Sequence, residues 1–260
     1  MPVVRSYADS AVVIAGASSG VGLASALAFV DAGVTRLALL SRSPERGEAA
    51  RERVQARNPA ATVEFIPVDV DDLAAVTRAV ALAHQKLGGI DVLVSSVTSA
   101  YRPDLLSRIE PSDIAGILTG QALPPMYLTR TVLPYLKEQG GGSIVLVASD
   151  AAKVATPGES VLGAAMAAIV MFSRTAAMEA KRDGIRINAV TPSLIAGTAT
   201  AARVLTDGFS KALFDKAATL AHLGVAEASD LAALIVFLGG PAAAKITGQA
   251  ISVNGGISAA

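Results

Sequence analysis

The sequence contains no cysteine among its 260 residues. This absence excludes disulfide bonds, metal sites built on thiolates and a cysteine nucleophile. It is compatible with a reducing cytoplasm, where we expect the protein to be located. Histidine occurs only at His84 and His222, each in a helical context without a second ligand nearby in sequence, so we predict no metal site.

The chain also lacks an excess of charge of either sign, because 22 Lys and Arg balance 22 Asp and Glu. It has no long basic or acidic run, so we predict no nucleic-acid partner. No stretch of about 18 uncharged apolar residues occurs, and the nearest, Val161 to Phe172, favours a buried helix over a membrane span. The first ten residues carry Arg5 and Asp9 without an apolar core, which predicts no signal peptide.

Hydrophobic residues make up 52% of the sequence, enough for a large core. Short β-branched runs alternate with longer alanine-rich runs of helical character. The predicted strands are 12–15, 37–40, 63–68, 92–94, 144–147, 185–190 and 250–253, and the predicted helices are 20–32, 44–57, 71–87, 111–138, 161–181 and 229–238. A long irregular stretch is expected at 192–222. This alternation predicts a parallel sheet covered on both faces, in a single domain spanning 1–260.

A glycine-rich segment, Gly16-Ala17-Ser18-Ser19-Gly20-Val21-Gly22, lies between the first predicted strand and the first predicted helix. Glycine permits a tight turn and close approach of the backbone to a phosphate. The helix beyond it offers free N–H groups and a positive dipole end to an anion. The segment therefore indicates a nucleotide site, with an unliganded strand-to-helix turn as the alternative.

Several further motifs follow in a fixed order along the chain. They are Asp69-Val70, Asp91-Val92-Leu93-Val94, Gly142-Ser143-Ile144-Val145 before Ser149, Gly184-Ile185-Arg186-Ile187-Asn188-Ala189-Val190-Thr191-Pro192, Ile246-Thr247-Gly248-Gln249 and Asn254-Gly255-Gly256. With the glycine segment, they make the chain resemble the short-chain dehydrogenase/reductase family from about residue 10 to 257. The resemblance implies one Rossmann-type doubly wound α/β domain with about seven parallel strands and ligands at their carboxyl ends. It also implies a lid-like segment near 192–222 and a homo-oligomer, either a dimer or a homotetramer, with a mixed oligomer containing an active paralogue as the alternative.

The resemblance implies a nicotinamide dinucleotide as cofactor. Ser41 and Arg42 end the second predicted strand, where an NAD site usually has an acidic residue. A hydroxyl and a permanent cation suit a 2′-phosphate, so NADP(H) is favoured over NAD(H), and an Arg42 that is only a solvated loop residue is the alternative. Asp69 would face the adenine, unless it caps the helix that starts near Asp71. The full set of cofactor-binding candidates is Gly16, Ser18, Ser19, Gly20, Val21, Gly22, Ser41, Arg42, Asp69, Val70, Pro192 and Ile195.

The catalytic pattern of the family is only partly present. The family uses a tyrosine as general acid or base, a lysine four residues later, a serine that orients the carbonyl and an asparagine that shapes a proton path. Ser149 matches the serine and Gln121 stands at the place of the asparagine, but Leu162 replaces the tyrosine and Met166 the lysine. Neither replacement can exchange a proton. Together with Ile169 and Val170 they form an apolar stripe at helical spacing, which is typical of a packing surface.

Other polar groups could take over the proton. A positioned acid or base contributes on the order of 10²–10⁴ in rate, so its loss would leave little ordinary ketone reduction. The candidates in the loops after the fourth and fifth strands are Tyr101, Asp150, Lys153, Thr156 and Glu159. For each of them the default expectation is a solvated loop residue.

Pro124 and Pro125 lack N–H groups and leave the carbonyls of Gly120 and Gln121 without their usual donors. A free carbonyl at Gln121 could hold a water, as in the family's proton path. The plainer alternative is a helix that begins at Pro124, with a separate turn before it.

Three functions remain open from the sequence. The first is a divergent NADP(H)-dependent oxidoreductase acting on a small carbonyl, imine or activated alkene with a non-standard proton donor. The second is a catalytically silent family member that serves as a partner subunit or as a ligand-sensing module. The third is a lyase or isomerase that uses Ser149 with Asp150 or Glu159. Family membership favours the first.

Overall fold

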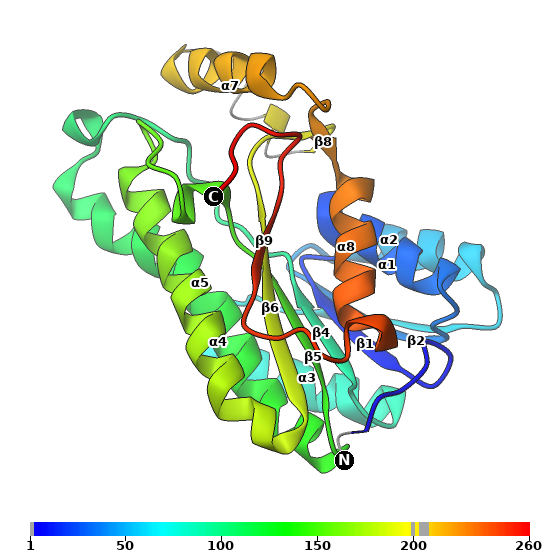
Figure 1. The fold of residues 1–260 in the computed structure, drawn as a ribbon. Coiled ribbons are helices and arrows are strands. Elements are labelled where there is room, and N and C mark those ends of the chain that lie inside the picture. Colours follow the sequence, from blue (N-terminus) through cyan, green and yellow to red (C-terminus); the bar gives the residue numbers. More distant parts are fainter. Residues whose placement is uncertain (1–2, 199–200, 203–207) are drawn as a thin grey trace.

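The computed structural model describes residues 3–198, 201–202 and 208–260. Its centre is a seven-stranded parallel sheet with the strand order β3-β2-β1-β4-β5-β6-β9 (Figure 1). The strands are β1 (Ala11–Ala15), β2 (Arg36–Ser41), β3 (Thr62–Pro67), β4 (Val92–Ser95), β5 (Gly142–Val147), β6 (Ile185–Pro192) and β9 (Ala250–Val253). A separate two-stranded sheet joins β7 (Ile195–Ala196) to β8 (Ala226–Glu227). The predicted Rossmann-type architecture is confirmed.

Helices cover both faces of the sheet (Figure 1). They are α1 (Gly20–Asp31), α2 (Pro44–Arg57), α3 (Leu73–Leu87), α4 (Ile114–Glu138), α5 (Ser160–Ala180), α7 (Gly208–Leu220) and α8 (Ala228–Gly239). Short 3₁₀ turns are η1 (Leu106–Arg108), η2 (Pro111–Asp113), η3 (Asp150–Ala152), η4 (Lys181–Asp183) and η5 (Pro241–Ala243). One apolar core lies between the sheet and α3, α4 and α5, and a second lies between the sheet and α1, α2 and α8.

The apolar strands form these layers because both of their faces are buried. All five residues of β1 are buried, as are the four of β4. Local signals fix the helix ends: Ser43 caps α2 ahead of Pro44, and Asp72 caps α3 by accepting from the backbone N–H groups of Ala74 and Ala75. The burial of continuous apolar strands on both faces is what a parallel sheet requires.

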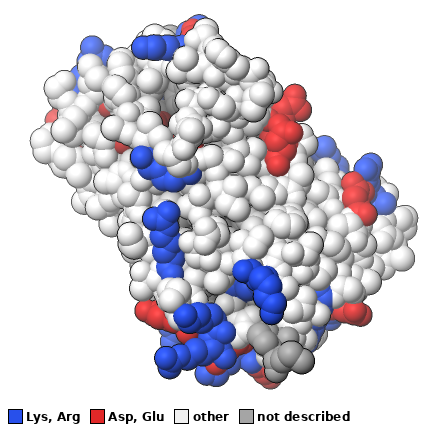
Figure 2. Space-filling model, in the orientation of Figure 1, with Lys and Arg blue, Asp and Glu red and all other residues white. Residues whose placement is uncertain are grey.

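The helix α5 is long and apolar enough, with the turn that follows it, to cross a membrane by length and composition alone. Its inward face, however, carries Met166, Ile169 and Val170, which belong to the core between the sheet and α3, α4 and α5. The helix is therefore accounted for as a core helix. On the face shown in Figure 2, Lys and Arg lie in separate groups with uncharged surface between them.

Two predicted features are wrong. The stretch 192–222 is not irregular, because α7 occupies 208–220 and stands over the carboxyl ends of the strands (Figure 1); residues 199–200 and 203–207 of the predicted lid lie outside the described residues. The helix around Gln121 does not begin at Pro124, because α4 runs without a break from Ile114 to Glu138. Packing of its buried face, which includes Gln121, Pro124 and Pro125, holds these prolines inside the helix.

Candidate functional site

The glycine turn is built by close backbone approaches. Gly16 has φ +82°, and a Cβ there would lie 2.4 Å from the carbonyl oxygen of Ser96 in the loop after β4. A Cβ on Gly22 would lie 2.3 Å from the carbonyl oxygen of Gly16. Both positions therefore exclude any side chain, and the turn is pressed against the first turn of α1.

The N-terminus of α1 is open to an anion. Ser19 precedes the helix in an extended conformation, its side chain makes no capping hydrogen bond, and the first turn carries no acidic residue. Ser18 and Ser19 retain solvent exposure, Val21 is buried beneath them, and Gly20 has φ +52°. Free N–H groups and the helix dipole suit a phosphate at this point.

The end of β2 lies directly beside the turn, because the N–H groups of Gly16 and Ala17 both donate to the carbonyl oxygen of Leu40, at 2.8 and 3.3 Å. Ser41 is buried, and its Oγ has no hydrogen-bond partner among the residues that the structure describes. Arg42 is exposed and makes no ion pair or hydrogen bond within the described ranges. A permanent cation and an unused hydroxyl thus stand together where the ribose of a dinucleotide would lie.

Asp69 follows β3 and is exposed. Its Oδ1 accepts from the backbone N–H of Asp71 at 3.2 Å. The alternative that Asp69 caps the following helix is wrong, because α3 begins at Leu73 and its cap is Asp72. Val70 is half-buried against the core, and Oδ2 of Asp69 accepts no hydrogen bond from the described residues.

Ser149 directly follows β5 and Ala148, and it is half-buried. Its Oγ accepts from the backbone N–H of Ala151 at 3.2 Å, which leaves its O–H proton free to donate to a ligand. Gln121 is 4% exposed, and its side chain is occupied: Nε2 donates to the Oγ of Ser99 at 2.7 Å, and Oε1 accepts from the Ser99 N–H at 3.4 Å. Gln121 therefore fixes the loop after β4.

Leu162 and Met166 form an apolar wall. Met166 is 7% exposed within the core, and Leu162 is half-buried against the same core. The predicted packing stripe with Ile169 and Val170 is confirmed. No proton can be exchanged at this stretch of α5.

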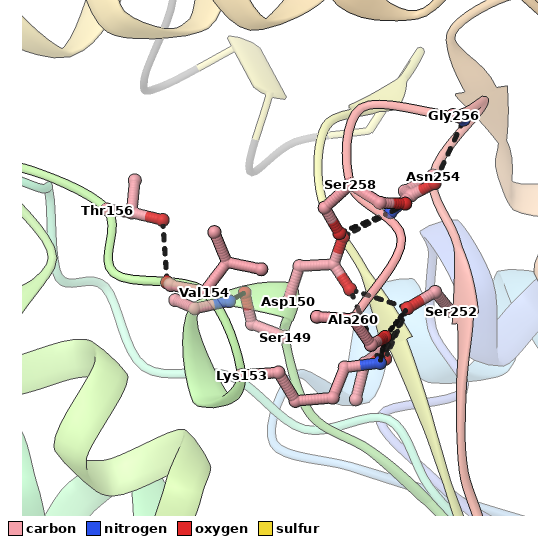
Figure 3. Close-up of polar contacts among 12 residues, drawn as sticks. Ser149, Asp150, Lys153, Val154, Thr156, Ser252, Asn254, Gly256, Ser258 and Ala260 are labelled. Carbon is pink, nitrogen blue, oxygen red and sulfur yellow. Dashed lines mark hydrogen bonds and ion pairs between the residues drawn. The ribbon is translucent and has the colours of Figure 1, made fainter.

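Asp150 and Lys153 bind the C-terminal segment, and their side chains point toward it (Figure 3). The buried carboxylate of Asp150 accepts from the hydroxyls of Ser252 and Ser258, each at 2.9 Å, and from the amide of Asn254. Lys153 Nζ donates to Ser252 Oγ at 2.6 Å, to the oxygen of Ala260 at 2.6 Å, and lies 3.8 Å from Asp150 Oδ1. The expectation of solvated loop residues is wrong for this pair, because tertiary contacts bury them.

The sequence signal for this network was the motif Asn254-Gly255-Gly256, where Asn254 Oδ1 accepts from the N–H of Gly256 at 3.0 Å. That motif contributed to the family resemblance, but it did not indicate that Asn254 would bind Asp150. Thr156 donates to the carbonyl oxygen of Val154 at 3.1 Å and is partly buried. Neither Thr156 nor the Asp150 network offers a free acid or base.

Glu159 and Tyr101 are also not solvated. Glu159 is 8% exposed, and burial raises the pKa of its carboxyl from 4.5 to about 7. The phenol oxygen of Tyr101 is buried without a hydrogen bond of normal geometry among the described residues. Burial raises the pKa of Tyr101, the Asp104 backbone lowers it in part, and the charges of Asp104 and Glu159 raise it further. Glu159 and Tyr101 are therefore electrostatic neighbours.

The last two cofactor candidates lie near the second sheet. Pro192 is buried at the end of β6, in register with Val253 of β9, and Ile195 is in β7, paired with Ala226 of β8. The structure thus brings the candidates from β1, β2, β3, β5 and β6 to the carboxyl edge of one sheet. Among the described residues, no group of three His, Cys, Asp or Glu side chains could hold a metal ion.

Comparison with known proteins identifies the family. A family model described as enoyl-(acyl carrier protein) reductase matches residues 16–258. The chain is 28% identical over 250 residues to the 3-oxoacyl-[acyl-carrier-protein] reductase of Vibrio harveyi, covering 94% of this chain and 96% of that protein. It is 29% identical over 254 residues to the 7alpha-hydroxysteroid dehydrogenase of Bacteroides fragilis, covering 97% and 95%. The solved structure of levodione reductase superposes with a TM-score of 0.88 at 26% identity, covering 95% and 97%. The chain therefore belongs to the short-chain dehydrogenase/reductase family of oxidoreductases.

Proposed function

We propose that this protein is an NADP(H)-dependent oxidoreductase that acts on a small carbonyl, imine or activated alkene and takes its proton from a group other than the family's tyrosine. The observation that carries the cofactor assignment is that Arg42 and the adjacent Ser41 hydroxyl both lack a partner among the residues that the structure describes. A guanidinium there attracts a 2′-phosphate, whereas the carboxylate typical of NAD sites would repel it. The names of the two curated relatives, a 3-oxoacyl-[acyl-carrier-protein] reductase and a 7alpha-hydroxysteroid dehydrogenase, support a carbonyl or alcohol substrate.

The residues present fit such a dinucleotide. The uncapped N-terminus of α1 would hold its pyrophosphate, Ser41 and Arg42 its 2′-phosphate, and Asp69 its adenine. When bound, the cofactor supplies hydride chemistry, and the protein supplies position and electrostatics. The hydroxyl of Ser149 donates to the substrate oxygen, and the wall of Leu162 and Met166 excludes water from that side of the pocket.

The cofactor assignment is tested by calorimetric titration with NADPH and NADH. We expect wild-type protein to bind NADPH more tightly than NADH. Arg42→Ala should weaken NADPH binding about tenfold, because a charge-assisted contact is lost, and should leave NADH binding unchanged. Arg53→Ala, which removes an exposed arginine of α2, is the control. Equal loss for both cofactors, or no binding of either, contradicts the proposal.

A second candidate is a catalytically silent partner subunit, and it is favoured by the apolar packing of Leu162 and Met166. We also propose that the chain forms a dimer or tetramer. Exposed apolar side chains support this proposal, and they are Ile114 and Leu118 of α4 and Met171 and Met178 of α5. Native mass spectrometry after expression alone and with an active paralogue separates the two candidates. A homo-oligomer that oxidises NADPH with a carbonyl substrate excludes the silent role.

A further inference from the structure

The carboxyl of Glu159 lies one helical turn before the residue that replaces the tyrosine. It directly precedes Ser160, the first residue of α5, and stands three positions before Leu162, so the two residues share one end of this helix. Glu159 is 8% exposed, makes no capping hydrogen bond, and has no ion pair or hydrogen bond within the ranges that the structure describes. A buried carboxyl without a partner is costly to maintain, and such groups are concentrated where they act on a ligand.

Tyr101 adds a second unused polar group at the same place. Its phenol oxygen is buried and has no hydrogen-bond partner among the residues that the structure describes, and the charge of Glu159 contributes to the raised pKa of Tyr101. Asp104 is the other charged group beside Tyr101. Two elements far apart in sequence, the loop after β4 and the start of α5, each carry a buried polar group without a hydrogen bond or ion pair among the described residues, and α7 contacts both elements.

The helix α7 covers both of these elements. Ser210 donates to the carbonyl oxygen of Pro103 at 3.2 Å, close to Tyr101 in the chain. Phe209 lies against Gly158, where a Cβ would be 2.3 Å from the ring and where φ is +88°. Of its charged residues, Lys211 and Asp215 pair with each other at the surface, and Lys216 is exposed. Phe209 of α7 therefore packs beside Gly158, the residue before Glu159, and Glu159 forms no ion pair with a cation among the described residues.

The other polar groups nearby are already engaged. Asp150 and Lys153 are committed to the C-terminal segment, and Thr156 donates to a backbone carbonyl. Burial raises the pKa of Tyr101, which makes the phenol a weaker acid than usual, whereas burial places the pKa of Glu159 at about 7, where both protonation states are available near neutral pH. Glu159 is therefore suited to act as an acid, whereas Tyr101 is suited to act as a hydrogen-bond donor.

We propose that Glu159 supplies the proton in place of the absent tyrosine, and that Tyr101 donates a hydrogen bond to the same substrate oxygen. The proposal rests on the proposed function, with reduced nicotinamide as the reductant. As hydride reaches the carbonyl carbon, the C=O electron pair moves to oxygen, an O–H bond forms to that oxygen, and the O–H bond of the Glu159 carboxyl breaks. The carboxylate then recovers a proton from water, so the sum is one carbonyl, one NADPH and one proton converted to one alcohol and one NADP⁺.

The first test does not depend on turnover. Infrared spectra of protein labelled with ¹³C-glutamate are recorded against pH, for wild type, for Glu159→Gln and for Glu52→Gln, a control in which the lost carboxyl is exposed on α2. We expect a carboxyl that titrates near neutral pH in wild type and the control and is absent from Glu159→Gln. Its midpoint should be lower with NADP⁺ than with NADPH, because the oxidised ring carries a positive charge close to the group. If the Glu159 carboxyl of wild-type protein titrates in the acidic range, or titrates at the same pH with NADP⁺ and NADPH, the proposal is wrong.

The second test measures NADPH oxidation with a panel of small carbonyl compounds, after calorimetry has established NADPH binding for each variant. We expect Glu159→Gln to lose on the order of 10²–10⁴ in rate while NADPH affinity is unchanged. The wild-type rate should fall as pH rises through neutrality, and that dependence should disappear in the variant. An unchanged rate in Glu159→Gln refutes the role of Glu159 and leaves the proposed function standing. Failure of wild type to bind NADPH refutes both.

Discussion

The two ends of the site differ in how their polar groups are used. At the glycine turn, the N-terminus of α1 is uncapped and Arg42 is unpaired within the described residues, so polar groups face outward without protein partners. At the opposite end, Leu162 and Met166 are packed into the core, and Asp150 and Lys153 are consumed by the C-terminal segment. The exception is Glu159, which is buried without a hydrogen bond or ion pair in the described part of the chain. The glycine turn thus leaves polar groups available to a ligand, whereas core packing fills the positions of Leu162 and Met166.

The largest effect we expect on stability comes from Glu159. The pKa of Glu159 is raised in the folded protein from 4.5 to about 7, so the native state holds this proton more tightly than the unfolded chain. Its contribution to the free energy of unfolding is fully present below about pH 4.5 and is lost as pH rises to about 7. The loss is ~3 kcal/mol as an upper bound.

Urea unfolding of wild type and Glu159→Gln at a series of pH values measures this contribution. The difference between them should shift in favour of the variant across the window from about pH 4.5 to about 7, because glutamine never becomes charged. Glu52→Gln should run parallel to wild type. If the difference in free energy of unfolding between Glu159→Gln and wild type does not change with pH, Glu159 behaves like an ordinary surface carboxyl and the prediction is wrong.

A second prediction tests the cofactor end. Gly16→Ala places a Cβ 2.4 Å from the backbone oxygen of Ser96 at φ +82°, whereas Gly33→Ala meets nothing within 4 Å at φ +104°. Both substitutions strain the backbone by ~1 kcal/mol, but only the first also forces the turn apart. We expect Gly16→Ala to be less stable than Gly33→Ala by ~2 kcal/mol in urea unfolding and to lose NADPH binding. Equal stabilities would mean that the turn tolerates a side chain.

The smallest predicted effect tests the hydrogen bonds between Asp150 and the C-terminal segment. The Asp150 carboxylate accepts hydrogen bonds from three donors, whereas the amide of Asp150→Asn replaces one accepting oxygen by a donating NH₂ group. The substitution should therefore destabilise the protein by ~1–2 kcal/mol and expose the segment after β9 to proteolysis. Asp215→Asn removes one partner of an exposed ion pair and should cost less than ~0.5 kcal/mol. If limited proteolysis does not distinguish the two variants, Asp150 does not hold the C-terminal segment.

Most of the sheet was predictable because its strands are continuous apolar runs buried on both faces. The boundaries of β3 and α3 shifted by one or two residues, and Asp72 rather than Asp69 caps α3, since adjacent aspartates offer similar caps in sequence. The helix α7 was missed because it packs few of its residues: only Ser210 is buried along its length. The prolines of α4 misled the prediction because tertiary packing outweighs the lost hydrogen bonds.

The sequence by itself determined the family and the doubly wound parallel sheet, because local patterns of apolar residues, glycines and motifs carry that information. It also determined that no ionisable group stands at Leu162 or Met166. Only the tertiary structure decided which loop carboxylates are engaged and which is free. Asp150 and Glu159 are indistinguishable as loop acids in the sequence, but Asp150 accepts hydrogen bonds from Ser252, Asn254 and Ser258 at the far end of the chain, whereas Glu159 is buried without a hydrogen bond or ion pair among the described residues. The physical reason is that desolvation and pairing depend on neighbours brought together by long-range packing, which the composition of a single loop does not specify.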